Sequence, residues 1–92
     1  MNRLSRIAVI CNKRGLHARA AAKLSTLANQ QPCSVYIGLD QSELKNAKNI
    51  MEVMMLAASC GCEVTLTAEG EQAQQALDCL VELINNRFDE DA

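Results

Sequence analysis

The 92-residue chain has almost no aromatic side chains: it contains one Tyr, one Phe and no Trp. Proteins that bind single-stranded nucleic acid stack bases on several aromatic rings. This scarcity and the net charge of −2 argue against a nucleic-acid binder. The chain also lacks any apolar run near the roughly 18 residues that a membrane span needs. We therefore expect neither nucleic-acid binding nor membrane insertion.

The five cysteines do not form a metal-binding pattern. Their number is odd, no CxxC pair occurs, and the chain has a single histidine. A structural zinc site usually needs two such pairs or several histidines. No secretory signal is evident in the first residues, so reduced thiols in a cytoplasmic protein are the expectation. We predict no metal site and no cofactor.

Charge is divided unevenly along the chain. Residues 1–50 hold eight of the nine basic residues and two of the eleven acidic ones, and residues 51–92 hold nine acidic residues and one arginine. The basic half could attract acidic partners, or both halves could simply be solvated surfaces. Residues 88–92 are expected to be a frayed acidic tail.

The spacing of apolar residues predicts seven elements. Strands are expected over residues 6–11, 33–39, 43–47 and 63–68, and helices over residues 18–29, 49–57 and 71–86. This order fits an α+β fold in which a four-stranded antiparallel sheet carries three helices on one face. The lengths suit one domain spanning residues 1–92.

The single histidine, His17, lies where a turn containing Gly15 meets the first expected helix. The first amides of a helix have no intrahelical acceptor and carry the positive end of the helix dipole. The amides of Ala18 and Arg19 would therefore attract an anion, and the Arg19 guanidinium suits phosphate oxygens. A neutral imidazole is a nucleophile that can take up a phosphoryl group. The alternative is that His17 is only a capping or surface residue.

The sequence around this histidine resembles the phosphohistidine signature of the HPr family, Gly-x-His-x-Arg-Pro-Ala/Ser. The matching residues are Gly15-Leu16-His17-Ala18-Arg19-Ala20-Ala21. Residues 48–56, residues 61–68 and the last helix are also similar to the family, so the resemblance spans nearly the whole chain. It implies the family's open-faced β-sandwich fold.

The resemblance also implies a function. HPr proteins are small phosphocarriers of the bacterial sugar phosphotransferase system, which accept a phosphoryl group from enzyme I and pass it to an enzyme IIA. By this likeness His17 would be phosphorylated on the ring nitrogen nearer the main chain, and Arg19 would stabilise the phosphate. Such a protein is a covalent carrier rather than an independent enzyme, and we expect it to act as a monomer. A regulatory module of the same fold, which docks on partners without relaying phosphate, is the alternative.

The chain departs from the family pattern at two positions. Ala20 stands where the signature has proline, at a helix position whose amide is free in any case, so the change should cost little. Asn49 stands where many Gram-positive members have a regulatory serine, so control by phosphorylation there is not expected. The acidic C-terminus is similar to the nitrogen-branch (NPr) members of the family.

The second helix carries more apolar side chains than one face can bury. Methionine adapts to several binding surfaces, and in the HPr family this helix contributes to the docking surface. We therefore predict that Lys48, Ile50, Met51 and Met54 contact partners, and that Leu56 belongs to the core.

Overall fold

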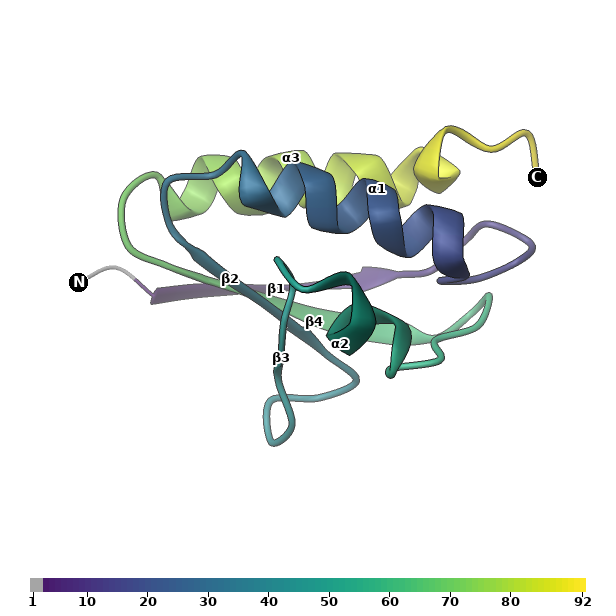
Figure 1. The fold of residues 1–92 in the computed structure, drawn as a ribbon, viewed down its shortest axis with the longest axis horizontal. Coiled ribbons are helices and arrows are strands. Elements are labelled where there is room, and N and C mark those ends of the chain that lie inside the picture. Colours follow the sequence, from purple (N-terminus) through teal and green to yellow (C-terminus); the bar gives the residue numbers. More distant parts are fainter. Residues whose placement is uncertain (1–2) are drawn as a thin grey trace.

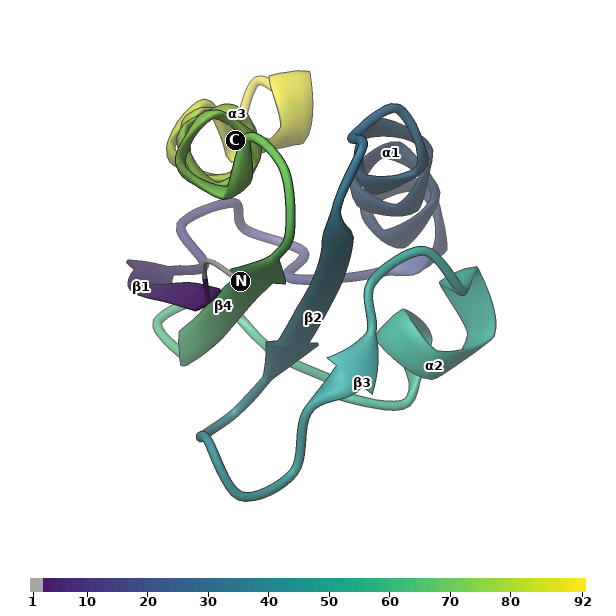
Figure 2. The same ribbon diagram turned by 90° about the vertical axis from the view of Figure 1, so that its left-hand side faces the viewer.

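The computed structural model describes residues 3–92. One antiparallel sheet, with strand order β1-β4-β2-β3, is formed by β1 (Arg3–Val9), β2 (Ser34–Gly38), β3 (Lys45–Asn46) and β4 (Glu63–Glu69). Helices α1 (Ala18–Asn29) and α3 (Ala73–Asn85) lie side by side over one face of this sheet (Figure 1). The short helix α2 (Ile50–Met54) lies beside β3, below α1 (Figure 2). The predicted α+β open-faced sandwich is confirmed.

The core lies between the sheet and the two long helices. The apolar positions of α1 and α3 recur every three or four residues, so each helix presents one apolar face to the sheet. The inward side chains of β2 and β4 meet these faces. The fully buried residues of this layer include Ala20, Ala21, Leu24, Val35, Ile37, Val64, Leu66, Leu77, Leu80 and Ile84.

The bounds of β1 and α2 differ from those that the sequence predicts: β1 covers residues 3–9 rather than 6–11, and α2 covers residues 50–54 rather than 49–57. After Val9 the Ile10 amide still donates to the Cys62 carbonyl at 2.9 Å, but the Ile10 carbonyl accepts from the Gly61 amide at 2.7 Å rather than from Cys62. The regular ladder of β1 therefore ends at Val9. Helix α2 spans five residues, and Asn49 caps it: its side-chain oxygen accepts hydrogen bonds from two amides in the first turn of the helix.

The C-terminus is not the frayed tail that the sequence predicts. After α3 the chain makes a short turn, η1 (Arg87–Asp89), in which Phe88 is completely buried. All three residues of η1 have φ between 53° and 64°, a region that L-residues rarely adopt. Lys23 of α1 donates a hydrogen bond to the Phe88 carbonyl at 2.8 Å. These contacts hold the tail against the beginning of α1, at the same end of the molecule (Figure 1).

Phe88 should therefore contribute to stability as a core residue. We expect Phe88→Ala to lower the free energy of unfolding by about 3 kcal/mol, because it leaves a cavity in a close-packed core. Phe88→Leu, which keeps most of the volume, should cost less than about 1.5 kcal/mol. Urea denaturation followed by circular dichroism measures both. A loss below about 1 kcal/mol in Phe88→Ala would contradict the packing of this residue.

Candidate functional site

The loop before α1 fixes where His17 stands. Gly15 has φ of +69°, and a Cβ atom there would lie 2.7 Å from the carbonyl oxygen of Ala58, so only glycine fits. The next amide, that of Leu16, donates to the same carbonyl at 2.8 Å. Leu16 itself is buried. The loop after α2 thus holds the backbone that leads into His17.

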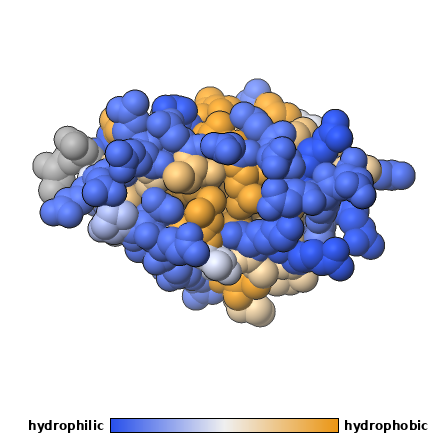
Figure 3. Space-filling model, turned by 90° about the horizontal axis from the view of Figure 1, so that it is seen from above, coloured by the Kyte–Doolittle hydropathy of each residue, from blue (hydrophilic) through white to orange (hydrophobic). Residues whose placement is uncertain are grey.

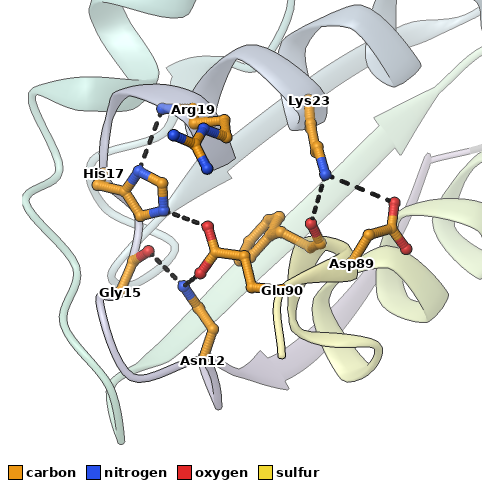
Figure 4. A network of polar contacts seen from close by, with 8 residues as sticks. Asn12, Gly15, His17, Arg19, Lys23, Asp89 and Glu90 are labelled. Carbon is orange, nitrogen blue, oxygen red and sulfur yellow. Dashed lines mark hydrogen bonds and ion pairs between the residues drawn. The ribbon is translucent and has the colours of Figure 1, made fainter. Parts of the chain in front are cut away.

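His17 is the residue that caps α1. Its backbone is extended, with φ of −76° and ψ of −179°, and its carbonyl accepts the first helical hydrogen bond from the Ala21 amide at 2.8 Å. The imidazole folds over the start of the helix, and its Nδ1 accepts from the Arg19 amide at 3.2 Å. Its Nε2 contacts the Glu90 carboxylate (Figure 4). The side chain is 23% exposed, so a partner can reach it.

The backbone donors near Nδ1 differ in part from those predicted. The Arg19 amide is already bound to the imidazole. Across residues 3–92, no hydrogen bond uses the amides of Ala18 or Ala20. Alanine in place of the signature's proline leaves a donor at Ala20 that proline lacks. The start of α1 therefore has a positive dipole end and two unpaired amides, one on the exposed residue Ala18 and one on the fully buried residue Ala20.

Cationic side chains surround the tail and the start of α1. Lys13, Arg14, Arg19 and Lys23 line a depression together with the acidic residues of the tail. Arg19 is exposed, and its guanidinium takes part in none of the ion pairs found among residues 3–92. The guanidinium is thus available to an incoming anion. Lys23 is one turn further along α1 and is occupied by the tail.

Glu90 and Asn12 belong to the site but were not predicted. Glu90, whose side chain is 13% exposed, accepts a hydrogen bond from the Asn12 amide group at 3.0 Å. The same group donates to the Gly15 carbonyl at 2.7 Å. The hydrogen bond from Asn12, followed by the one from His17 and the charge of Arg14, lowers the pKa of Glu90 below its ordinary value. No sequence pattern connects these residues, because 78 positions separate Asn12 from Glu90.

Helix α2 exposes an apolar surface. Val53 is its one buried residue, while Met51 is 66% exposed and Met55, which was not predicted, is 69% exposed. We refer to the exposed residues as the α2 patch: Ile50, Met51, Met54 and Met55. Viewed from the helix side, apolar surface reaches the edge of the molecule near α2 (Figure 3).

Lys48 and Leu56, which lie on either side of the α2 patch in the sequence, are less exposed than the patch residues. Lys48 is half-buried, and its ammonium donates to the Gln31 carbonyl at 3.3 Å, which links the segment before α2 to the end of α1. Lys48 therefore makes a contact within the protein at a position predicted to face partners. Leu56 is half-buried and packs against the core.

Two further structural features concern metals and membranes. Within residues 3–92, no three His, Cys, Asp or Glu side chains are grouped so that they could hold a metal ion. In the same part of the chain, no helix has both the length and the apolar character needed to cross a membrane.

Comparison with known proteins identifies the family. Residues 4–86 match the family model described as "PTS HPr component phosphorylation site". The chain is 56% identical to the phosphocarrier protein HPr of Pseudomonas aeruginosa over 81 residues, which cover 88% of this chain and 90% of that protein. It is 41% identical to the phosphocarrier protein NPr of Shewanella violacea, over 98% of each chain.

A solved structure of HPr-C-His from Thermoanaerobacter tengcongensis superimposes with a TM-score of 0.86 at 36% identity, covering all of both chains. The fold, the family match and the sequence identity agree over nearly the whole length. The chain belongs to the HPr family of phosphocarrier proteins of the phosphotransferase system.

Proposed function

We propose that this protein carries a phosphoryl group on Nδ1 of His17, accepting it from a phosphorylated enzyme I and passing it to an enzyme IIA-type protein. The observation that carries the proposal is the position of Nδ1, which faces the Arg19 amide at the start of α1. A nucleophilic ring nitrogen and donors for an anion thus lie together. The match to the HPr family supports the same role.

The chemistry needs a nucleophile and a place for negative charge. The lone pair of Nδ1 attacks phosphorus, and the bond from phosphorus to the donor breaks. The phosphoryl oxygens then lie beside the amides at the start of α1 and within reach of the Arg19 side chain. The Arg19 amide donates to the Nδ1 lone pair before the reaction, so it must release that lone pair for the attack on phosphorus and can then donate to a phosphoryl oxygen. Its position at the start of α1 places it at the site before the charge arrives.

The relay requires two partners that use the same face in turn. The α2 patch and the start of α1 are held together by the contacts of Gly15 and Leu16 with the loop after α2. A partner that covers the patch therefore reaches His17 as well. We propose that both partners dock on this combined face and that the protein works as a monomer.

The phosphoryl group should be found on His17 alone. After incubation with enzyme I and phosphoenolpyruvate, intact-mass measurement should show one added phosphoryl group, which acid removes. His17→Ala should gain none while keeping its circular dichroism spectrum. A wild-type protein that binds enzyme I and gains no mass would favour the regulatory-module alternative over the relay.

Arg19 should affect transfer but not folding. We expect Arg19→Ala to slow phosphorylation about tenfold or more, which is the size of losing a hydrogen bond to a charged group. Because the side chain is exposed, thermal stability should change little. Rapid-quench kinetics and a melting curve of the same sample measure the two effects. A large drop in melting temperature with normal transfer would contradict the assignment.

The α2 patch should affect docking. Met51→Glu places a charge on a side chain that is 66% exposed, so it should weaken binding of enzyme I about tenfold and leave folding intact. Ile7→Glu is the matched control, because Ile7 is 67% exposed on β1, outside the patch. Calorimetric titration compares them. Equal weakening by both variants, or unfolding of Met51→Glu, would exclude this docking surface.

A further inference from the structure

The imidazole of His17 is held at both of its nitrogens. A backbone amide can only donate, so the contact from the Arg19 amide requires a lone pair on Nδ1. A neutral imidazole with its lone pair on Nδ1 carries its hydrogen on Nε2. That hydrogen faces the Glu90 side chain. An ionised carboxylate has no hydrogen to donate, so it can only accept a hydrogen bond from Nε2. The two contacts therefore select one tautomer, in which Nδ1 is the nucleophile.

We propose that Glu90 is a positioning residue for phosphoryl transfer, which fixes His17 in the Nε2–H tautomer and blocks Nε2 from reacting. The inference rests on the proposed role of His17 and extends it to the C-terminal tail. In a Ser-His-Asp triad, a carboxylate likewise orients the catalytic histidine by accepting a hydrogen bond from its second ring nitrogen. Here the histidine is itself the nucleophile.

The surroundings of Glu90 suit this role. Its carboxylate is mostly buried and receives a hydrogen bond from Asn12, which is itself fully buried and bonded to Gly15. Asn12 therefore ties the carboxylate to the same loop that places His17. On the other side, buried Phe88 and its hydrogen bond from Lys23 anchor the tail two residues before Glu90. The carboxylate is thus fixed from both directions.

The hydrogen bond also matches the change in charge during transfer. As the Nδ1 lone pair forms the bond to phosphorus, the bond from phosphorus to the donor breaks and the donor keeps that electron pair. The hydrogen stays on Nε2, so the ring becomes positive beside the Glu90 carboxylate. When the phosphoryl group leaves, the N–P bond electrons return to Nδ1 and the original tautomer is restored.

A pair of alanine variants tests the inference. Glu90→Ala removes the carboxylate that contacts His17. Asp91→Ala is the matched control, because it removes an equal charge from the next residue, which is exposed and holds the tail through its backbone carbonyl. The ¹⁵N spectrum of the imidazole distinguishes the tautomers without any partner protein. At neutral pH, wild type and Asp91→Ala should show the Nε2–H tautomer, and Glu90→Ala should show a mixture.

The reaction with phosphoramidate, a small phosphoryl donor, extends the test to chemistry without docking. Wild type and Asp91→Ala should be modified on Nδ1 alone, as ³¹P and ¹⁵N spectra of the product show. Glu90→Ala should also be modified on Nε2, and its reaction at Nδ1 should be about three- to tenfold slower, the size of losing one hydrogen bond. Glu90→Gln keeps the shape of the tail and should likewise admit both tautomers.

The results also distinguish this inference from the proposed function. If Glu90→Ala keeps the single tautomer and the wild-type rate, Glu90 has no positioning role. A faster reaction of Glu90→Ala would show that the tail shields His17, which also overturns that role. Either result leaves His17 as the acceptor. A wild-type protein that shows the single tautomer but gains no phosphoryl group from enzyme I would overturn the relay instead. Melting curves of all variants should agree within a few degrees, because Phe88 and Lys23 still anchor the tail.

Discussion

The hydrogen bond from the Arg19 amide to Nδ1 of His17 is the interaction on which the site depends. It makes the side chain of His17 the cap of its own helix, so the ring nitrogen that we propose as the nucleophile and the amides at the start of α1 belong to one structural unit. This geometry requires an extended backbone at His17 and a sharp turn just before it. That turn requires glycine, because a Cβ atom at Gly15 would clash with the carbonyl oxygen of Ala58.

The same close approach connects the site to the α2 patch. Gly15 and Leu16 contact the loop that follows α2, so the backbone that leads into His17 is tied to the segment that carries the exposed methionines. Methionine side chains adapt to different shapes, which suits the proposed docking of two partners in turn. Cationic side chains near the start of α1 lie beside the acidic tail, and among residues 3–92 the Arg19 guanidinium takes part in no ion pair. The carrier thus combines fixed chemistry with an adaptable contact area.

The C-terminal tail provides the second contact of the imidazole. Three consecutive residues, Arg87 to Asp89, adopt positive φ, which is costly for L-residues and is maintained only where surrounding contacts hold it. Burial of Phe88 and the hydrogen bonds of Lys23 and Glu90 are those contacts. The acidic end of the chain therefore lies among basic residues of the first half, which pairs the two oppositely charged parts of the sequence.

Local patterns in the sequence were enough to predict much of the fold and the centre of the site. The apolar period marked α1 and α3 with errors of at most two residues, and the turn before His17 placed the imidazole at a helix start. Strand ends were predicted less well, because backbone pairing with distant turns decides them, as for Ile10 with Cys62. The sequence predicts that Lys48 contacts partners, but it could not show the hydrogen bond from Lys48 to the Gln31 carbonyl, which depends on how the chain leaves α1.

By itself, the sequence was enough to predict which histidine caps the first helix and which arginine follows it, because these lie within three residues of one another and follow from local backbone chemistry. Only the tertiary structure decided which groups contact the second nitrogen of His17. Asn12 and Glu90 are brought together by the sheet and α3, most of which lie between them in the sequence, and Phe88 is buried where the sequence predicts a frayed tail. Contacts across 73 or more residues leave no periodic trace in a single sequence, since they depend on packing rather than on neighbouring residues.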